Sequence, residues 1–161
     1  MSGQKVLSNQ MPIAIKNSLI DISSEETTKE LAKNFSNYLK GGEVIFLYGE
    51  MGVGKTTFVK YFINQFQKKK RLKTTEVTSP TFNLLIEYEA DDLIIKHYDL
   101  FRLKDESELK NLDLFDINQN TITLIEWPEL ISKGNFEKTI DLVFSYENEL
   151  NNRSVKIDGL D

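Results

Sequence analysis

Cysteine is absent from the sequence, and proline and histidine are rare. The absence of cysteine excludes disulfides, thiolate metal sites and a cysteine nucleophile. No apolar run approaches the ~20 residues that a membrane span needs. Residues 1–17 also lack the continuous apolar core of a signal peptide, so we expect a cytoplasmic protein with no membrane partner.

A basic excess is missing too. The chain has 20 Lys and Arg residues against 25 Asp and Glu residues, a formal net charge of −5 and a pI near 5.1. A protein that binds nucleic acid unaided normally carries a basic excess, because phosphate contacts supply much of its affinity. We therefore expect other proteins to hold any RNA. The one basic run, residues 67–73, is typical of a solvated helix end and is also where a direct RNA contact would be sought.

The length of 161 residues and the hydrophobic content of 40% are typical of one globular domain. We predict a flexible N-terminal lead over residues 1–17 and a single domain over residues 18–161. Hydrophobic periodicity predicts, in order, a strand at 19–23, a helix at 23–42, a strand at 43–48, a helix at 55–70, a strand pair folded about 90–92, a helical or mixed segment at 104–120, a strand at 121–127 and a strand pair around 148–152.

The first predicted helix has clear end signals. Ser23 and Glu26 match a capping box, and Gly41 and Gly42 favour a left-handed stop. Its predicted apolar face consists of Leu31, Phe35, Tyr38 and Leu39.

A glycine-rich loop follows the buried strand at 43–48. Gly49, Gly54, Lys55 and Thr56 satisfy G-x-x-x-x-G-K-[ST], the phosphate-binding loop. Glycines let the backbone approach a phosphate, and successive N–H groups then form an anion nest at the N-terminus of the next helix. We predict that the nucleotide is bound by Glu50, Met51, Gly52, Val53, Gly54, Lys55, Thr56 and Thr57.

The position of this loop also predicts the fold class. A strand, a phosphate-binding loop and an amphipathic helix form the centre, and strand pairs lie outside them. We therefore predict an α/β fold, a P-loop NTPase-like three-layer sandwich with a mixed central sheet and peripheral antiparallel hairpins. A guanine-reading N-K-x-D segment is absent, which favours ATP over GTP.

P-loop enzymes hold Mg²⁺ with the loop hydroxyl and an acidic residue at the end of a neighbouring strand. Thr56 supplies the hydroxyl, and the two candidate carboxylates are Asp99 and Glu126. Glu126 could instead be a surface carboxylate at a strand exit, and Asp99 a helix cap or an ion-pair partner of Arg102. We predict Lys55, Asp99 and Glu126 as catalytic residues, and Thr56, Glu126 and Asp99 as the metal site.

Together the motifs resemble the TsaE (YjeE) family, P-loop ATPases of bacterial tRNA threonylcarbamoyladenosine biosynthesis. The resemblance rests on SSEET, GEMGVGKTTF, TSPTF, HYDLFRL and LIEWPE in that order, over residues 19–159. It implies a Mg²⁺-dependent ATPase that is weak alone and acts with a TsaB–TsaD complex. That pair transfers threonylcarbamoyl to adenosine 37 of tRNAs reading ANN codons, and ATP hydrolysis is thought to reset it between rounds. Contact with tRNA would then be indirect, through the complex.

The resemblance also implies residue roles. It assigns Lys55 and Thr56 to phosphate and metal, Glu126 to the Mg²⁺ site, and Asp99 to metal holding or water positioning. Thr81 matches a residue that senses the γ-phosphate, and Thr27 or Thr28 matches a threonine near the base. Phe101 stands where tyrosine is usual in the family, and residues 110–117 replace a usual Leu-Gly pair.

Two other functions remain open from the sequence. A nucleotide-gated binding module with negligible turnover would have the same motifs, since a partner can supply missing catalytic groups. A small-molecule kinase is disfavoured because such enzymes usually clamp phosphates with several arginines, whereas this chain has only Arg71, Arg102 and Arg153.

Overall fold

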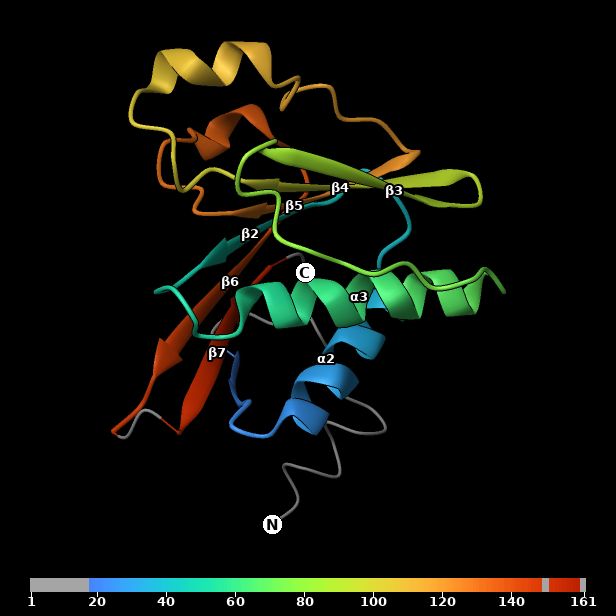
Figure 1. The fold of residues 1–161 in the computed structure, drawn as a ribbon, viewed down its shortest axis with the longest axis vertical. Helices are drawn as coiled ribbons and strands as arrows, with labels where there is room; N and C mark the ends of the chain where they lie inside the picture. Colours follow the sequence, from blue (N-terminus) through green and yellow to red (C-terminus); the bar gives the residue numbers. More distant parts are fainter. Residues whose placement is uncertain (1–17, 149–150, 160–161) are drawn as a thin grey trace.

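The structure is a computed structural model that describes residues 18–148 and 151–159. The predicted flexible lead, residues 1–17, lies outside the described residues. A seven-stranded mixed sheet forms the centre of the described part (Figure 1). Its strands are β1 (Ser18–Asp21), β2 (Val44–Tyr48), β3 (Leu85–Ala90), β4 (Leu93–Asp99), β5 (Thr121–Glu126), β6 (Thr139–Tyr146) and β7 (Arg153–Asp158).

The sheet has the strand order β1-β7-β6-β2-β5-β4-β3. Its central strands β4, β5, β2 and β6 are parallel, whereas β3 and the β7–β1 pair are antiparallel additions at the two edges. Strand β2 is buried from Val44 to Leu47, as a strand covered on both faces must be. Because β4, β5 and β2 run in parallel, their carboxyl ends meet at one edge of the sheet, where α/β proteins bind ligands.

Helices α2 (Glu25–Tyr38) and α3 (Lys55–Lys69) pack on each other and on one face of the sheet. Phenylalanines dominate this layer: the Phe35 and Phe58 rings pack in a T-shaped, edge-to-face arrangement with centroids 5.6 Å apart. Phe62 and Phe66 continue the buried face of α3, which confirms the helix predicted from their spacing. No helix in the described part of the chain combines the length and the apolar character that crossing a membrane requires.

The opposite face is covered by irregular chain and short 3₁₀ helices. These helices are η1 (Glu106–Asn111) and η2 (Lys133–Asn135). Leu109, Leu114 and Ile131 pack there on Phe46 and Tyr98 of the sheet, forming a second core. The predicted three-layer sandwich is confirmed, and within the described residues its third layer lacks a long α-helix.

The structure corrects three details of the first predicted helix. Ser24, not Ser23, caps α2 by accepting a hydrogen bond from the Glu26 N–H. The helix ends at Leu39 with extended backbone, and the glycines of positive φ follow it rather than cap it. Tyr38 is 43% exposed, because the chain turns at Leu39 and buries that residue instead.

Candidate functional site

The glycine loop adopts backbone conformations that only glycine accepts readily. Gly49, Gly52 and Gly54 have φ angles of 143°, 80° and 119°. A Cβ on Gly49 would lie 2.8 Å from the Phe144 carbonyl oxygen, so this position also lacks space for a side chain. Gly54 is the N-cap of α3, and no side chain caps the helix there. The first N–H groups of α3 are therefore left to bind another acceptor, as a phosphate-binding loop requires.

Lys55 is buried at the first position of α3. Its Nζ donates a hydrogen bond to the Gly49 carbonyl oxygen at 2.5 Å and lies 3.6 Å from the centroid of the Trp127 ring. Burial lowers the pKa of the Lys55 ammonium, and the nearby carboxylates of Glu126, Asp99 and Glu129 oppose that shift. Two neutral groups, the Gly49 carbonyl and the Trp127 ring, thus contact the Lys55 ammonium directly. The nearby carboxylates favour the charged form of the lysine.

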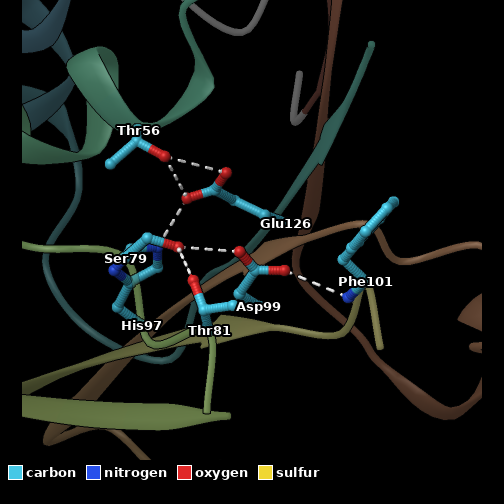
Figure 2. A network of polar contacts seen from close by, with 7 residues as sticks. All are labelled: Thr56, Ser79, Thr81, His97, Asp99, Phe101 and Glu126. Carbon is cyan, nitrogen blue, oxygen red and sulfur yellow. Dashed lines mark hydrogen bonds and ion pairs between the residues drawn. The ribbon is translucent and has the colours of Figure 1, made fainter. Parts of the chain in front are cut away.

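Glu126 ends β5 and is the centre of a buried hydrogen-bond network (Figure 2). The Thr56 hydroxyl lies 3.1 and 3.0 Å from its two carboxylate oxygens. His97 Nε2 lies 2.7 Å from Oε2, within hydrogen-bond distance. The side chains of Glu126 and His97 are 3% and 0% exposed. Two neighbours from two elements therefore fix the Glu126 carboxylate.

Asp99 ends β4 and pairs in register with Glu126 of the parallel strand β5. Its Oδ2 accepts a hydrogen bond from the Ser79 hydroxyl at 2.8 Å, and its Oδ1 accepts one from the Phe101 N–H at 3.0 Å. The Thr81 hydroxyl lies 3.3 Å from Ser79 Oγ, which links the segment before β3 to this carboxylate. Both predicted carboxylates thus lie at the same edge of the sheet. The described ion pairs do not include one between Asp99 and Arg102, whose guanidinium instead lies over the Phe82 ring.

Trp127 follows Glu126 with φ of +57°, an uncommon conformation for a residue with a side chain. Its ring contacts both Lys55 Nζ and the Phe101 ring, and the centroids of the two rings are 4.8 Å apart. The strained turn after β5 therefore places an aromatic side chain over the loop lysine.

These residues surround one cavity of about 330 Å³, a size that suits a small ligand. Its lining consists of Met51, Gly52, Gly54, Lys55, Thr56, Thr57, Ser79, Thr81, Asp99, Phe101, Glu126 and Trp127. The predicted residues Glu50, Val53 and Thr28 are not part of this lining: the side chains of Val53 and Thr28 are buried, and that of Glu50 is exposed. The described residues contain no group of three His, Cys, Asp or Glu side chains able to hold a metal alone.

Reasoning from the sequence missed three features of the site. His97 was not predicted as a site residue, yet its ring contacts Glu126. Ser79 was not considered, although its hydroxyl lies two positions before Thr81 in the same segment. Trp127 was not predicted as a site residue. Its position directly after Glu126, a predicted strand-end carboxylate, could have indicated that it lies near the site.

Comparison with known proteins identifies the family. A sequence model described as "Threonylcarbamoyl adenosine biosynthesis protein TsaE" matches residues 22–155. The tRNA threonylcarbamoyladenosine biosynthesis protein TsaE of Rickettsia conorii is 41% identical over 110 residues, which are 68% of this chain and 61% of that relative. The protein of the same name from Aquifex aeolicus is 36% identical over 137 residues, 84% of this chain and 92% of the relative.

A solved structure agrees with these sequence matches. The crystal structure of Bacillus subtilis YdiB superposes with a TM-score of 0.68 at 25% sequence identity, covering 91% of this chain and 87% of that one. The family match includes the glycine loop, both strand-end carboxylates and the sheet that joins them. The chain therefore belongs to the TsaE family.

Proposed function

We propose that this chain binds and hydrolyses ATP with Mg²⁺ in the cavity above the glycine loop, as a component of tRNA threonylcarbamoyladenosine biosynthesis. One observation carries the proposal: Lys55, Thr56, Asp99 and Glu126 line the same cavity at the carboxyl ends of β2, β4 and β5. The family membership supports the pathway, because the relatives carry its name.

Phosphate binding would use the loop and the start of α3. The uncapped N–H groups after Gly54 are donors for the phosphate oxygens, and Lys55 adds a positive charge for the β- and γ-phosphates. To reach them, the Lys55 ammonium would exchange its hydrogen bond with the Gly49 carbonyl for a phosphate oxygen.

The donor set fits Mg²⁺. This ion prefers oxygen ligands and commonly takes one or two carboxylates together with phosphates and water, so it does not need a cage of three protein carboxylates. The Thr56 hydroxyl and the Glu126 carboxylate, already in contact, would hold it. Bound there, the metal would neutralise charge on the phosphates. His97 would keep the Glu126 carboxylate oriented from behind.

Asp99 would position the attacking water or a metal-bound water beside the γ-phosphate. Its carboxylate is held by Ser79 and by the Phe101 N–H, so its direction is fixed before a ligand arrives. Thr81, joined to Ser79, would sense the γ-phosphate from the same segment. Fixed groups of this kind lower the cost of reorganisation in phosphoryl transfer.

Large apolar side chains around the cavity support action with protein partners. Met51 and Phe101 line the cavity and are 66% and 50% exposed, and Phe82, next to Thr81, is 81% exposed. Exposed apolar groups gathered at one place commonly mark a protein–protein contact. We propose a TsaB–TsaD complex as the partner, with tRNA contacted through that complex.

ATP hydrolysis tests the proposal. Turnover would be measured for the chain alone and with a TsaB–TsaD complex from the same source, and Lys55→Ala should lower it at least ~100-fold. We expect the complex to raise turnover. Turnover that ignores the complex would contradict the proposed pathway role.

The same assay tests a nucleotide-gated module. The described contacts give this alternative some support, because Glu126 and Asp99 both already accept hydrogen bonds from protein groups. ATP binding without turnover, alone or with the complex, would favour the gated module. A kinase is not supported: no arginine of the described residues lines the cavity.

A further inference from the structure

Two side chains from β6 and β7, the strands on the opposite side of β2 from β5 and β4, lie close to the glycine loop. Tyr146 ends β6 and Arg153 begins β7, and the two residues are direct partners in the antiparallel ladder. A Cβ placed on Gly52 would lie 3.4 Å from the Tyr146 hydroxyl oxygen, and one placed on Gly54 would lie 3.7 Å from Arg153 Nη1. The guanidinium is therefore beside the N-cap of α3, where the first free N–H groups begin.

The backbone of Arg153 is firmly held. Its N–H donates a hydrogen bond to Ser23 Oγ at 2.9 Å, and its carbonyl oxygen accepts one from the Ile22 N–H at 2.9 Å. These contacts join the start of β7 to the segment between β1 and α2. The side chain thus extends toward the loop from a backbone position that is held by the segment between β1 and α2.

The charge of Arg153 is not matched within the described residues. Its Nε is buried and has no hydrogen-bond partner among them, and none of their ion pairs includes it. A half-buried guanidinium without an anion is unfavourable, and its planar set of donors suits a phosphate or the face of an aromatic ring. The structure therefore places beside the loop a cation whose buried Nε has no partner among the described residues.

The sheet order indicates which end of a nucleotide this cation meets. The metal and γ-phosphate groups, Asp99 and Glu126, come from β4 and β5 on one side of β2. Tyr146 and Arg153 come from β6 and β7 on the other side. A phosphate chain whose terminal end faces β5 and β4 would have its α-phosphate and nucleoside toward β6 and β7.

We infer that the Arg153 guanidinium, beside the Tyr146 hydroxyl, binds the nucleotide at its α-phosphate and nucleoside end. This inference rests on the proposed function, since it takes the cavity to be a nucleotide site. ATP and ADP are identical at that end, so Arg153 contributes equally to the binding of both. That equality separates it from an arginine that stabilises the γ-phosphate, which would favour ATP alone.

Calorimetric binding of ADP and of a non-hydrolysable ATP analogue tests the assignment. Arg153→Gln, which keeps most of the side-chain length and removes the charge, should weaken both ligands by the same factor, roughly 10- to 100-fold. Arg153→Lys should recover part of the loss, because it restores charge without the planar donor set. Arg71→Gln is the matched control: that arginine is exposed and follows the C-terminal end of α3, the end opposite Gly54, so both affinities should stay unchanged.

Each outcome has a defined meaning. Unchanged affinities in Arg153→Gln, or a loss confined to the ATP analogue, would overturn the assignment while leaving the proposed function intact. Failure of the unaltered chain to bind either ligand would overturn the proposed function as well. Thermal unfolding of each variant shows whether the fold is kept, and Arg153→Lys provides the comparison if Arg153→Gln unfolds.

Discussion

The two walls of the cavity are built in different ways. The strand wall carries Asp99 and Glu126, which are 8% and 2% exposed and are fixed by the register of β4 against β5, and the fully buried His97 contacts Glu126. The opposite wall comes from loops, and its residues Met51 and Thr81 are exposed. One wall is part of the core, and the other is open to solvent.

The difference separates two tasks. Groups that stabilise charge in a reaction work best when they are already oriented, because no reorganisation is then needed. The buried strand wall meets that condition through the contacts of Glu126 with Thr56 and His97. Groups that recognise a ligand or a protein partner must be accessible from solvent. The exposed residues of the loop wall meet this requirement. Substitutions in the two walls should therefore differ in size and in kind.

The largest effect is expected from Glu126→Gln in the strand wall. It preserves shape but removes the charge that would hold the metal, so turnover should fall roughly 10²- to 10³-fold, while ADP binding without Mg²⁺ is kept. Steady-state turnover across a Mg²⁺ titration measures this. Glu137→Gln, at an exposed glutamate that does not line the cavity, is the control and should stay close to wild type. Turnover of Glu126→Gln within about threefold of wild type would remove Glu126 from the proposed site.

An intermediate effect is expected from His97→Gln. His97 contacts the proposed metal ligand from behind, and loss of such a partner typically weakens metal affinity about 10- to 100-fold. The apparent Mg²⁺ affinity in the turnover assay measures the change. Thr123→Val alters another buried side chain of the same sheet, whose hydroxyl lacks a partner among the described residues, and should leave Mg²⁺ affinity unchanged. Equal effects of both substitutions would mean that His97 acts only through packing.

The smallest effect is expected from Thr81→Ala in the loop wall. Its exposed hydroxyl contacts only Ser79 among the described hydrogen bonds, so folding stability should change by less than about 0.5 kcal/mol. If Thr81 senses the γ-phosphate, ATP affinity should fall about fivefold and ADP affinity should not. The ratio of the two affinities is the measurement. An equal loss for both nucleotides would assign Thr81 to the shared part of the ligand instead.

Much of the fold could be predicted from local signals. The glycine loop between β2 and α3, the hairpin of β3 and β4, and the buried strand that ends at Glu126 all follow from short stretches of chain. The errors arose where a distant segment intervened. Ser23 has the side chain of a helix cap, yet its hydroxyl accepts a hydrogen bond from the backbone of Arg153, so Ser24 caps α2.

The sequence by itself determined the glycine loop and the two strand-end carboxylates, because each depends on residue types at fixed spacing. Only the tertiary structure decided which groups meet there. His97 reaches Glu126, Ser79 reaches Asp99, and Arg153 reaches Gly54 across separate elements. The physical reason is that these contacts depend on strand order and register, which are set by packing of the whole sheet rather than by any local pattern.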